Sequence, residues 1–255
     1  FAETRAESPL IRLTMFRNPL LSASLIMSAL VSTVMMATLV VGPFYLSRTL
    51  GLHAALIGLV LSVGPLCAAL TGVPAGRLAD RLGPQRMTVL GLIGIAAGAF
   101  LLSVIPATLG IYGYTAPLIV ITVGYALFQT ANNTAVMTDT RPEQRGVISG
   151  LLNLSRNLGL ITGASVMGAV FAAASSTIDI TTAPPAAVAI GMQVAFAVAA
   201  VLILVAQSHR RTAGFRQHRL PLVIRKCLWH RLRTMLHETW IASLCATMDS
   251  TGETK

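Results

Sequence analysis

A short polar segment between two apolar stretches holds one carboxylate among three arginines. It reads Gly-Arg-Leu-Ala-Asp-Arg-Leu-Gly-Pro-Gln-Arg from Gly76 to Arg86. A carboxylate near a helix end can pair with an arginine or approach the positive N-terminus of a neighbouring helix. The residues that can form such a conformational latch are Gly76, Arg77, Asp80, Arg81, Gly83 and Arg86. The alternative interpretation is a solvated turn whose arginines only fix the orientation of the chain.

Three amide side chains lie inside another apolar stretch. Gln129, Asn132 and Asn133 are spaced i, i+3 and i+4, so they share one face of a helix. Polar groups at membrane depth are costly and are candidates for function. These amides can line a polar cavity, or they can hydrogen-bond a neighbouring helix and serve packing alone.

One cation also lies within an apolar stretch. Arg156 follows Asn153 by about one helical turn, and the two form a candidate polar cluster near the cytoplasmic end. The guanidinium can extend to the cytoplasmic interface, or it can form an ion pair. No apolar stretch has an acidic residue near its centre, because Asp80, Asp139 and Glu143 all fall near the ends. A proton-coupled mechanism would therefore need a carboxylate from another part of the protein.

The composition indicates that these polar groups are carried by elements that span a membrane. Of the 255 residues, 54% are hydrophobic and 11% are charged. Soluble domains carry about 25% charged residues, so a water-facing surface could not be covered here. Disorder is excluded as well, because it needs low hydrophobicity and high charge. The apolar runs are continuous rather than alternating, which indicates helices and not a barrel.

Six stretches are long enough to cross a bilayer core of about 30 Å, which needs about 20 apolar helical residues. They cover residues 20–41, 56–78, 87–105, 116–135, 146–173 and 186–206, and Gly42-Pro43 is predicted to end the first. The expected fold is an all-α, polytopic transmembrane helical bundle. The expected organisation is a cytoplasmic lead-in at 1–19, the bundle at 20–207, and a basic amphipathic cytoplasmic tail at 208–255.

The distribution of arginines predicts the orientation of the bundle. Six spans put both ends of the chain on one side, and basic residues favour the cytoplasmic side. The side shared with the N-terminus holds Arg5, Arg12, Arg17, Arg77, Arg81, Arg86, Arg141 and Arg145. The opposite side offers Arg48 and His53 in its first loop. We therefore expect an integral protein of the cell (cytoplasmic) membrane with both termini cytoplasmic.

The segment from Gly76 to Arg86 resembles the loop motif of the major facilitator superfamily. The match covers the Gly-x-Leu-Ala-Asp-Arg-x-Gly pattern and departs from the family at Pro84 and Gln85. Residues 141–159 look like the connection between the fourth and fifth helices in the C-terminal half of drug:proton antiporters. The resemblance covers about residues 10–207, one six-helix half. The Gly-Pro-x-x-Gly-Gly antiporter signature belongs to the other half and is not seen in this sequence.

The resemblance implies secondary transport by alternating access, with amphipathic drugs or small molecules exported in exchange for protons. In that family the first and fourth helices of each half line the central cavity. The candidate substrate cavity is therefore lined by Ser32, Met35, Met36, Phe128, Gln129, Asn132 and Asn133. The partners implied are the lipid bilayer, an amphipathic substrate, protons and a missing N-terminal half. We expect no enzyme activity, no cofactor, no metal and no nucleic acid.

Two features allow other interpretations. The last 48 residues, 208–255, carry nine Lys/Arg against three Asp/Glu, and those from 220 to 236 follow helical spacing. They predict an amphipathic helix on the anionic leaflet, although a fused or out-of-frame C-terminus would look similar. The chain also begins at Phe1, as a piece of a longer protein would. The rival function is an orphan half-bundle that acts as a non-transporting membrane interaction or scaffold protein.

Overall fold

A computed structural model describes residues 18–175 and 184–218 of the chain, with side chains described as far as Ser208. The chain divides into two compact units, Phe1–Arg211 and Thr212–Lys255. The account that follows concerns the first of them. Residues 1–17 of the lead-in predicted at 1–19, and the amphipathic segment at 220–236, lie outside the described residues.

The described part of the chain is built from helices and contains no strand. The six long helices are α1 (Pro19–Phe44), α2 (Ala54–Leu82), α3 (Pro84–Val104), α4 (Gly110–Thr138), α5 (Arg145–Ala174) and α6 (Pro185–His218). Three short elements join them: η3 (Tyr45–Thr49), η4 (Ala107–Leu109) and η5 (Pro142–Gln144). Each of the six is long and apolar enough to cross a membrane, which confirms the predicted fold class. The last helix continues beyond residue 207, where the tail was expected to begin.

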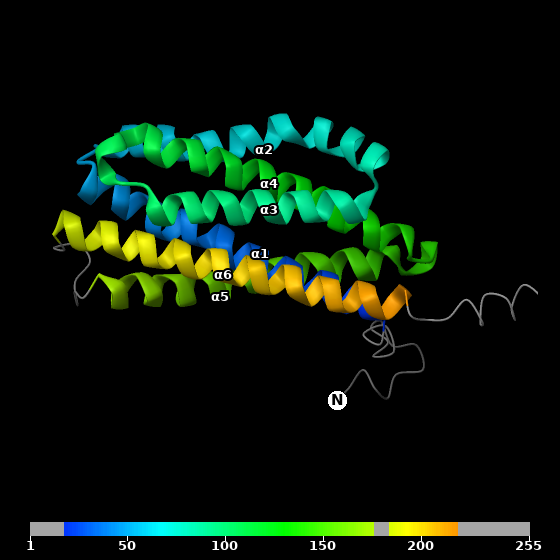
Figure 1. The fold of residues 1–255 in the computed structure, drawn as a ribbon. Coiled ribbons are helices and arrows are strands. Elements are labelled where there is room, and N and C mark those ends of the chain that lie inside the picture. The colour runs from blue at the N-terminus through cyan, green and yellow to red at the C-terminus, as the bar shows by residue number, and fades with distance from the viewer. Residues whose placement is uncertain (1–17, 176–183, 219–255) are drawn as a thin grey trace, which may run out of the picture. The chain divides into compact units, whose positions relative to one another are not determined.

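The helices α3 and α4 pack so closely that their backbones touch. A Cβ atom added at Gly91 of α3 would lie 2.6 Å from the backbone nitrogen of Phe128. A Cβ added at Gly124 of α4 would lie 2.8 Å from the carbonyl oxygen of Gly91. Small residues allow this approach, because membrane helices associate mainly through packing. Together with α2 these two helices form one group, seen in the upper part of the ribbon (Figure 1).

The helices α1 and α5 form a second pair of the same kind. A Cβ at Gly163 would lie 2.7 Å from Cα of Thr33, and one at Gly159 would overlap the carbonyl oxygen of Ala29. The hydroxyl of Thr33 donates to the Gly159 carbonyl at 3.0 Å, which adds a hydrogen bond to the contact. The absence of a Cβ at Gly159 and Gly163 therefore allows the two backbones to approach closely. A Cβ at Gly191 of α6 would lie 2.9 Å from the ring of Phe171 of α5.

The end of α1 differs from the prediction. Gly42-Pro43 was expected to stop the helix, but α1 continues to Phe44 and then into the five-residue π-helix η3. Proline removes one backbone hydrogen bond, and a local widening of the helix can accommodate that loss. Here the Leu50 nitrogen donates to the Tyr45 carbonyl at 3.3 Å, the i to i+5 bond of a π-turn. The prediction was wrong because proline within a membrane helix need not end it.

Aromatic rings tie this end of α1 to its neighbours. Tyr45 stacks on Tyr114 of α4, and Phe44 stacks on Phe171 of α5, each with ring centroids 5.9 Å apart. The Tyr114 hydroxyl also donates to the carbonyl of Thr38 at 3.3 Å. The end of the bundle farthest from Asn18 is therefore closed by packing between α1, α4 and α5.

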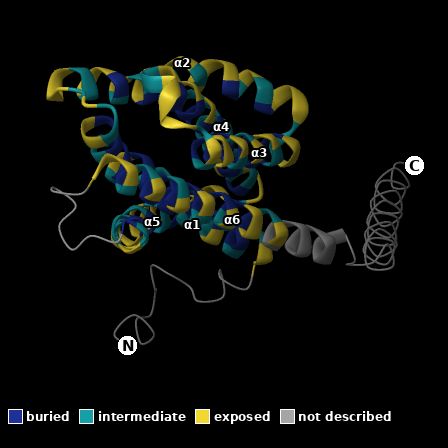
Figure 2. Ribbon diagram, turned by 60° about the vertical axis from the view of Figure 1, so that its left-hand side comes forward, coloured by how far each residue is buried: buried dark blue, intermediate teal, exposed yellow. Residues whose placement is uncertain are grey.

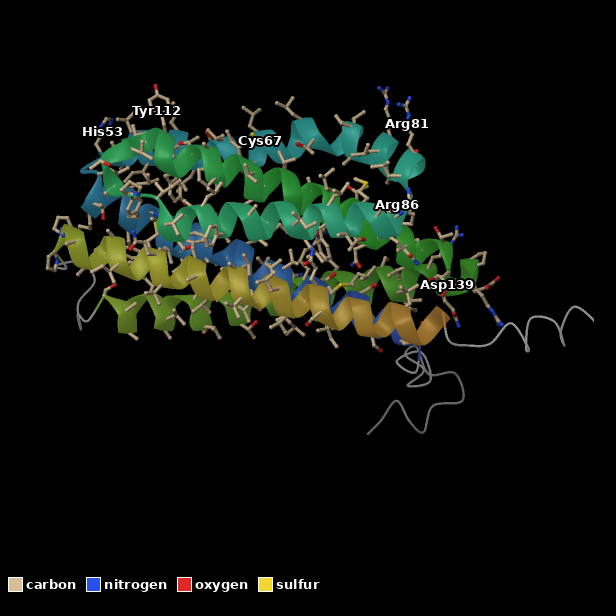
Figure 3. All side chains as sticks on the ribbon, in the orientation of Figure 1. His53, Cys67, Arg81, Arg86, Tyr112 and Asp139 are labelled. Atoms are coloured by element: carbon tan, nitrogen blue, oxygen red, sulfur yellow. The ribbon has the colours of Figure 1, made fainter. Side chains whose placement is uncertain are left out.

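The exposed faces of the helices are apolar along their length, and most charged side chains of the described residues lie near one end. In α2, Leu66, Leu70 and Val73 are more than half exposed, and exposed residues follow the outer side of this helix (Figure 2). Lipid tails or apolar protein surface are suitable neighbours for such side chains. Arg81, Arg86 and Asp139 lie at one end of the bundle, and His53 and Tyr112 lie at the other (Figure 3). The chain is an integral membrane protein.

Candidate functional site

A polar pocket of about 450 Å³ lies between α1, α4 and α5. Helix α1 contributes Ser28, and helix α4 contributes Gln129, Asn133 and Met137. Helix α5 contributes Ser149, Gly150, Leu152, Asn153 and Arg156. The volume falls in the range of about 300–1,000 Å³ that is typical of small-molecule sites.

The pocket unites two groups that the sequence treated separately. The amides Gln129 and Asn133 were candidates for a substrate cavity, whereas Asn153 and Arg156 were assigned to a cluster near the cytoplasmic end. Both groups line the same pocket. The close pairing of α5 with α1 through Gly159 holds α5 beside the end of α4 that carries the amides. The pocket therefore forms because α5, packed on α1, lies beside α4.

Ser149 was missed as a site residue, although its spacing carries a signal. Ser149, Asn153 and Arg156 are separated by four and three residues, which puts them on one face of α5. The wider lining also includes Met137, Gly150 and Leu152, whose residue types give no sign of a polar site. The spacing of these three polar residues therefore predicts a polar face on α5 that begins close to the helix start.

Several predicted cavity residues serve helix packing. Asn132 is 2% exposed, and its amide nitrogen donates to the Ser28 hydroxyl at 3.0 Å, so it bridges α4 and α1. Phe128 is fully buried beside Gly91 of α3. Because Asn132 and Phe128 point toward neighbouring helices, they are not among the residues that line the pocket.

Three predicted residues of the first span lie off the pocket as well. Ser32 is buried, and Met35 and Met36 are half-buried; none of the three is among the lining residues. Met36 lies against α5 near Gly163, where a Cβ would approach its side chain to 3.0 Å. The contribution of α1 to the lining is Ser28, about one helical turn closer to the start of the helix.

The latch residues surround the reversal between α2 and α3. Gly83 has φ of +79° and ψ of 150°, a conformation that favours glycine, and it allows α3 to start one residue later. Arg77, Asp80, Arg81 and Arg86 are exposed, while Gly76 is half-buried. Within the described residues Asp80 forms no ion pair with these arginines. The four charged side chains are thus free to meet a partner.

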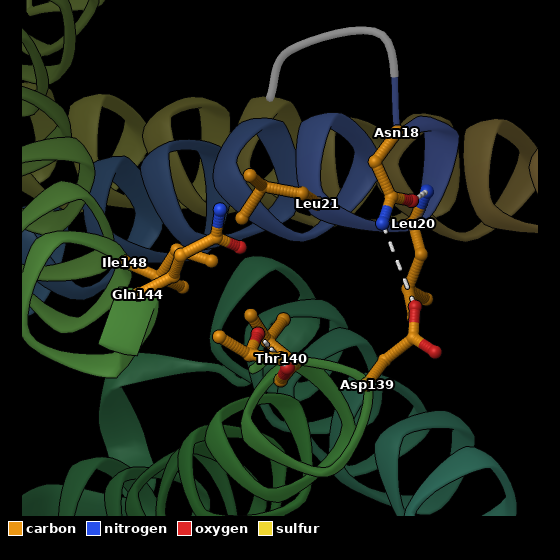
Figure 4. Close-up of a pocket in the computed structure, with 8 residues that line it drawn as sticks. Asn18, Leu20, Leu21, Asp139, Thr140, Gln144 and Ile148 are labelled. Carbon is orange, nitrogen blue, oxygen red and sulfur yellow. Dashed lines mark hydrogen bonds between the residues drawn. The ribbon is translucent and has the colours of Figure 1, made fainter. Parts of the chain in front are cut away.

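A second, smaller cavity of about 80 Å³ lies at the same end of the bundle, between α1, α4 and η5 (Figure 4). The Asn18 amide donates to the Asp139 carboxylate at 3.5 Å across its rim. A cluster of apolar side chains, Leu21, Val136, Ile148 and Leu152, borders both cavities.

The charge in the larger pocket comes from one residue. Arg156 is the only charged side chain in its lining, and its terminal nitrogen donates to the Asn153 amide oxygen at 2.6 Å. The other polar lining groups are neutral amides and hydroxyls. Among the described residues no group of three or more His, Cys, Asp or Glu could hold a metal ion. The pocket can therefore bind a small molecule through hydrogen bonds and one positive charge.

The comparison with protein families decides the identity of this helical bundle. A model described as the Major Facilitator Superfamily matches residues 2–164. The chain belongs to this superfamily. Superfamily members are membrane transporters, which agrees with the six apolar helices and the resemblance in the segment from Gly76 to Arg86.

Curated relatives in the superfamily are transporters by name. The chain is 34% identical over 159 residues to the uncharacterized transporter YebQ of Escherichia coli, covering 62% of this chain and 35% of that protein. It is 25% identical over 170 residues to the riboflavin transporter RibZ of Clostridioides difficile, covering 67% and 37%. It is 23% identical over 171 residues to the multidrug efflux pump LfrA of Mycolicibacterium smegmatis, covering 67% and 34%. The matched part therefore spans about a third of each relative.

Proposed function

We propose that this superfamily chain is one six-helix half of a secondary transporter that exports small amphipathic molecules by alternating access. The observation that carries the proposal is the pocket of about 450 Å³, whose polar lining comes from three different helices. In alternating access, one half of such a transporter rocks against the other around the binding site. The names of the relatives, one for multidrug efflux and one for riboflavin, support a small-molecule substrate.

The proposal includes proton coupling, with the drug:proton antiporters as the branch. Arg156 is the only ionisable residue in the pocket lining, and no lining residue is acidic. The carboxylate that carries the proton therefore belongs to another part of the protein, a partner N-terminal half. That half would also supply the groups that Asp80 and its neighbouring arginines meet when the latch closes.

The same proposal places the protein in the cytoplasmic membrane with both termini on the cytoplasmic side. The arginines at the α2–α3 reversal and around η5 lie at one end of the bundle, and this bias supports the orientation. The protein acts as a transporter and carries out no enzymatic step.

The test is transport in everted membrane vesicles from cells that make the full gene product, including any residues encoded before Phe1. Uptake of a panel of amphipathic fluorescent dyes is followed after a proton gradient is imposed, with and without a protonophore. Wild-type vesicles should accumulate at least one dye, and the protonophore should abolish that accumulation. Gln129→Leu and Asn133→Leu should each reduce it, since both remove a polar group from the pocket.

Thr162→Val is the matched control, because Thr162 is exposed on α5 and its hydroxyl bonds only within its own helix. It should transport as wild type does. Equal transport by the pocket variants and this control would contradict the placement of the site. If vesicles containing the full gene product move no dye, the rival function of a non-transporting half-bundle takes precedence.

A further inference from the structure

Among the charged residues of the described part of the bundle, Arg156 lies farthest from an end of its helix. Helix α5 has 30 residues and is therefore about 45 Å long, whereas the apolar core of a bilayer is about 30 Å thick. Arg156 lies about 16 Å from the first residue of α5, and the exposed side chains Leu154 and Leu158 flank it. Its backbone therefore lies about three turns into α5, between apolar exposed neighbours, and a charge in such surroundings is expensive and marks a functional position.

The side chain does not leave the pocket for the water interface. Arg156 is half-buried, lines the pocket and is fixed by its hydrogen bond to Asn153. That bond satisfies one donor of the guanidinium but neutralises no charge, because the amide of Asn153 is neutral. The three carboxylates among the described residues, Asp80, Asp139 and Glu143, lie near helix ends, and none forms an ion pair with Arg156. The charge of the pocket is therefore uncompensated within the described residues.

We infer that the pocket selects amphipathic organic anions, and that Arg156 binds their carboxylate. This inference rests on the proposed transport function and names the class of its substrate. A guanidinium has five donors in a planar fork that can hold a carboxylate through two parallel hydrogen bonds. The amide of Asn133 is a further donor in the same lining, and Met137 and Leu152 offer apolar surface for the body of the molecule.

A cationic compound is disfavoured by the same geometry. In a pocket that is partly shielded from water, like charges repel more strongly than they do in water. An ammonium group would need a lining carboxylate, and the lining has none. A neutral molecule would leave Arg156 without a counter-charge. An anion is the ligand that gains most from this lining.

The experiment uses the purified full gene product in detergent and three fluorescent probes of nearly the same shape. Pyrenebutanoate carries the carboxylate, its methyl ester is neutral, and pyrenebutylamine is cationic. Wild-type protein should bind pyrenebutanoate about tenfold or more tightly than either of the other probes. Arg156→Gln should reduce that preference to about twofold or less and leave the affinity for the ester within about twofold of wild type.

Two further variants keep the test decisive if Arg156→Gln does not fold. Arg156→Lys retains the charge without the planar fork, so part of the preference for the anion should remain. Asn153→Ala removes the partner of the guanidinium but leaves its charge, so the preference should persist. Loss of the preference in Asn153→Ala with retention in Arg156→Gln would contradict the role assigned to Arg156.

The outcomes separate this inference from the proposed function. Equal affinity of wild-type protein for all three probes would overturn anion selection, and that is also the result expected if a carboxylate from elsewhere in the protein already neutralises Arg156. Transport of dyes that depends on Gln129 and Asn133 would then still support the proposed function. Failure of wild-type protein to bind any probe, together with absence of dye transport, would remove both.

Discussion

The tight contact between α1 and α5 allows one prediction to be worked out in detail. Replacing Gly159 by alanine puts a Cβ into the backbone of α1, where it would overlap the Ala29 carbonyl oxygen and lie 2.8 Å from the Ala29 Cα. Backbone atoms cannot rotate away as a flexible side chain can. The two helices must therefore separate by several tenths of an ångström or more.

Two costs add up in the Gly159→Ala variant. Overpacking a well-packed contact costs about 1–3 kcal/mol. Separation of the helices also lengthens the hydrogen bond from the Thr33 hydroxyl to the Gly159 carbonyl, which is worth about 0.6 kcal/mol in a membrane protein. The expected loss of stability is about 2–4 kcal/mol. For a chain of this size that corresponds to a fall in Tm of roughly 5–15 °C.

The assay is thermal unfolding of the purified protein in detergent, followed by circular dichroism. Gly146→Ala is the matched control on the same helix, because a Cβ at Gly146 meets nothing within 4 Å. Alanine in a helix is more favourable than glycine by up to about 1 kcal/mol, so this control should be unchanged or slightly more stable. A Gly159→Ala protein as stable as the Gly146→Ala protein would refute the backbone contact.

Three other predictions address the latch, the helix bridge and the reversal. Asp80→Asn should reduce transport strongly while the amount of protein in the membrane, measured by immunoblot, stays the same; undiminished efflux would remove the latch hypothesis. Asn132→Leu should lower stability by about 1 kcal/mol, because the bond to Ser28 is lost. Its relative affinities for the anionic, neutral and cationic pyrene probes should not change, and a changed order would show that Asn132 contacts the ligand. Gly83→Ala should lower stability by about 1–3 kcal/mol, because φ of +79° strains any residue with a Cβ. Gly72→Ala, on a helical position where a Cβ meets nothing within 4 Å, should not, and melting curves of the two variants make the comparison.

The helices could be predicted from the sequence because each apolar run is long, continuous and separated from the next by charge, glycine or proline. The predicted start of the sixth, at residue 186, is one residue from the observed start at Pro185. The predicted end of the first helix at Gly42-Pro43 was wrong. The helix passes through Pro43 and continues into the π-helix η3. Proline removes one backbone hydrogen bond, but here the helix continues past it. Phe44 and Tyr45, which follow the proline, stack on aromatic rings of α5 and α4, and this packing is not visible in the sequence.

The site was harder to predict than the helices, because it depends on which helices pair. The spacing of Gln129, Asn132 and Asn133 put all three amides on one face, yet Asn132 turns to α1 while its neighbours line the pocket. A helix face is about 100° wide or more, so residues at its two edges can meet different partners. Arg156 was placed in a separate polar cluster with Asn153, because the sequence does not reveal that α5 lies beside the amides of α4. Pairing of that kind is a tertiary property.

The glycine contacts between α3 and α4 and between α1 and α5 also bear on how such a protein can evolve. These contacts are made by backbone at Gly91, Gly124, Gly159 and Gly163, so few substitutions are tolerated there. The side chains that line the pocket take little part in them, and Asn133, Ser149 and Asn153 are exposed. Replacing a lining residue therefore costs little folding free energy. The range of compounds that the pocket accepts can drift by single mutations while the helix pairs remain intact.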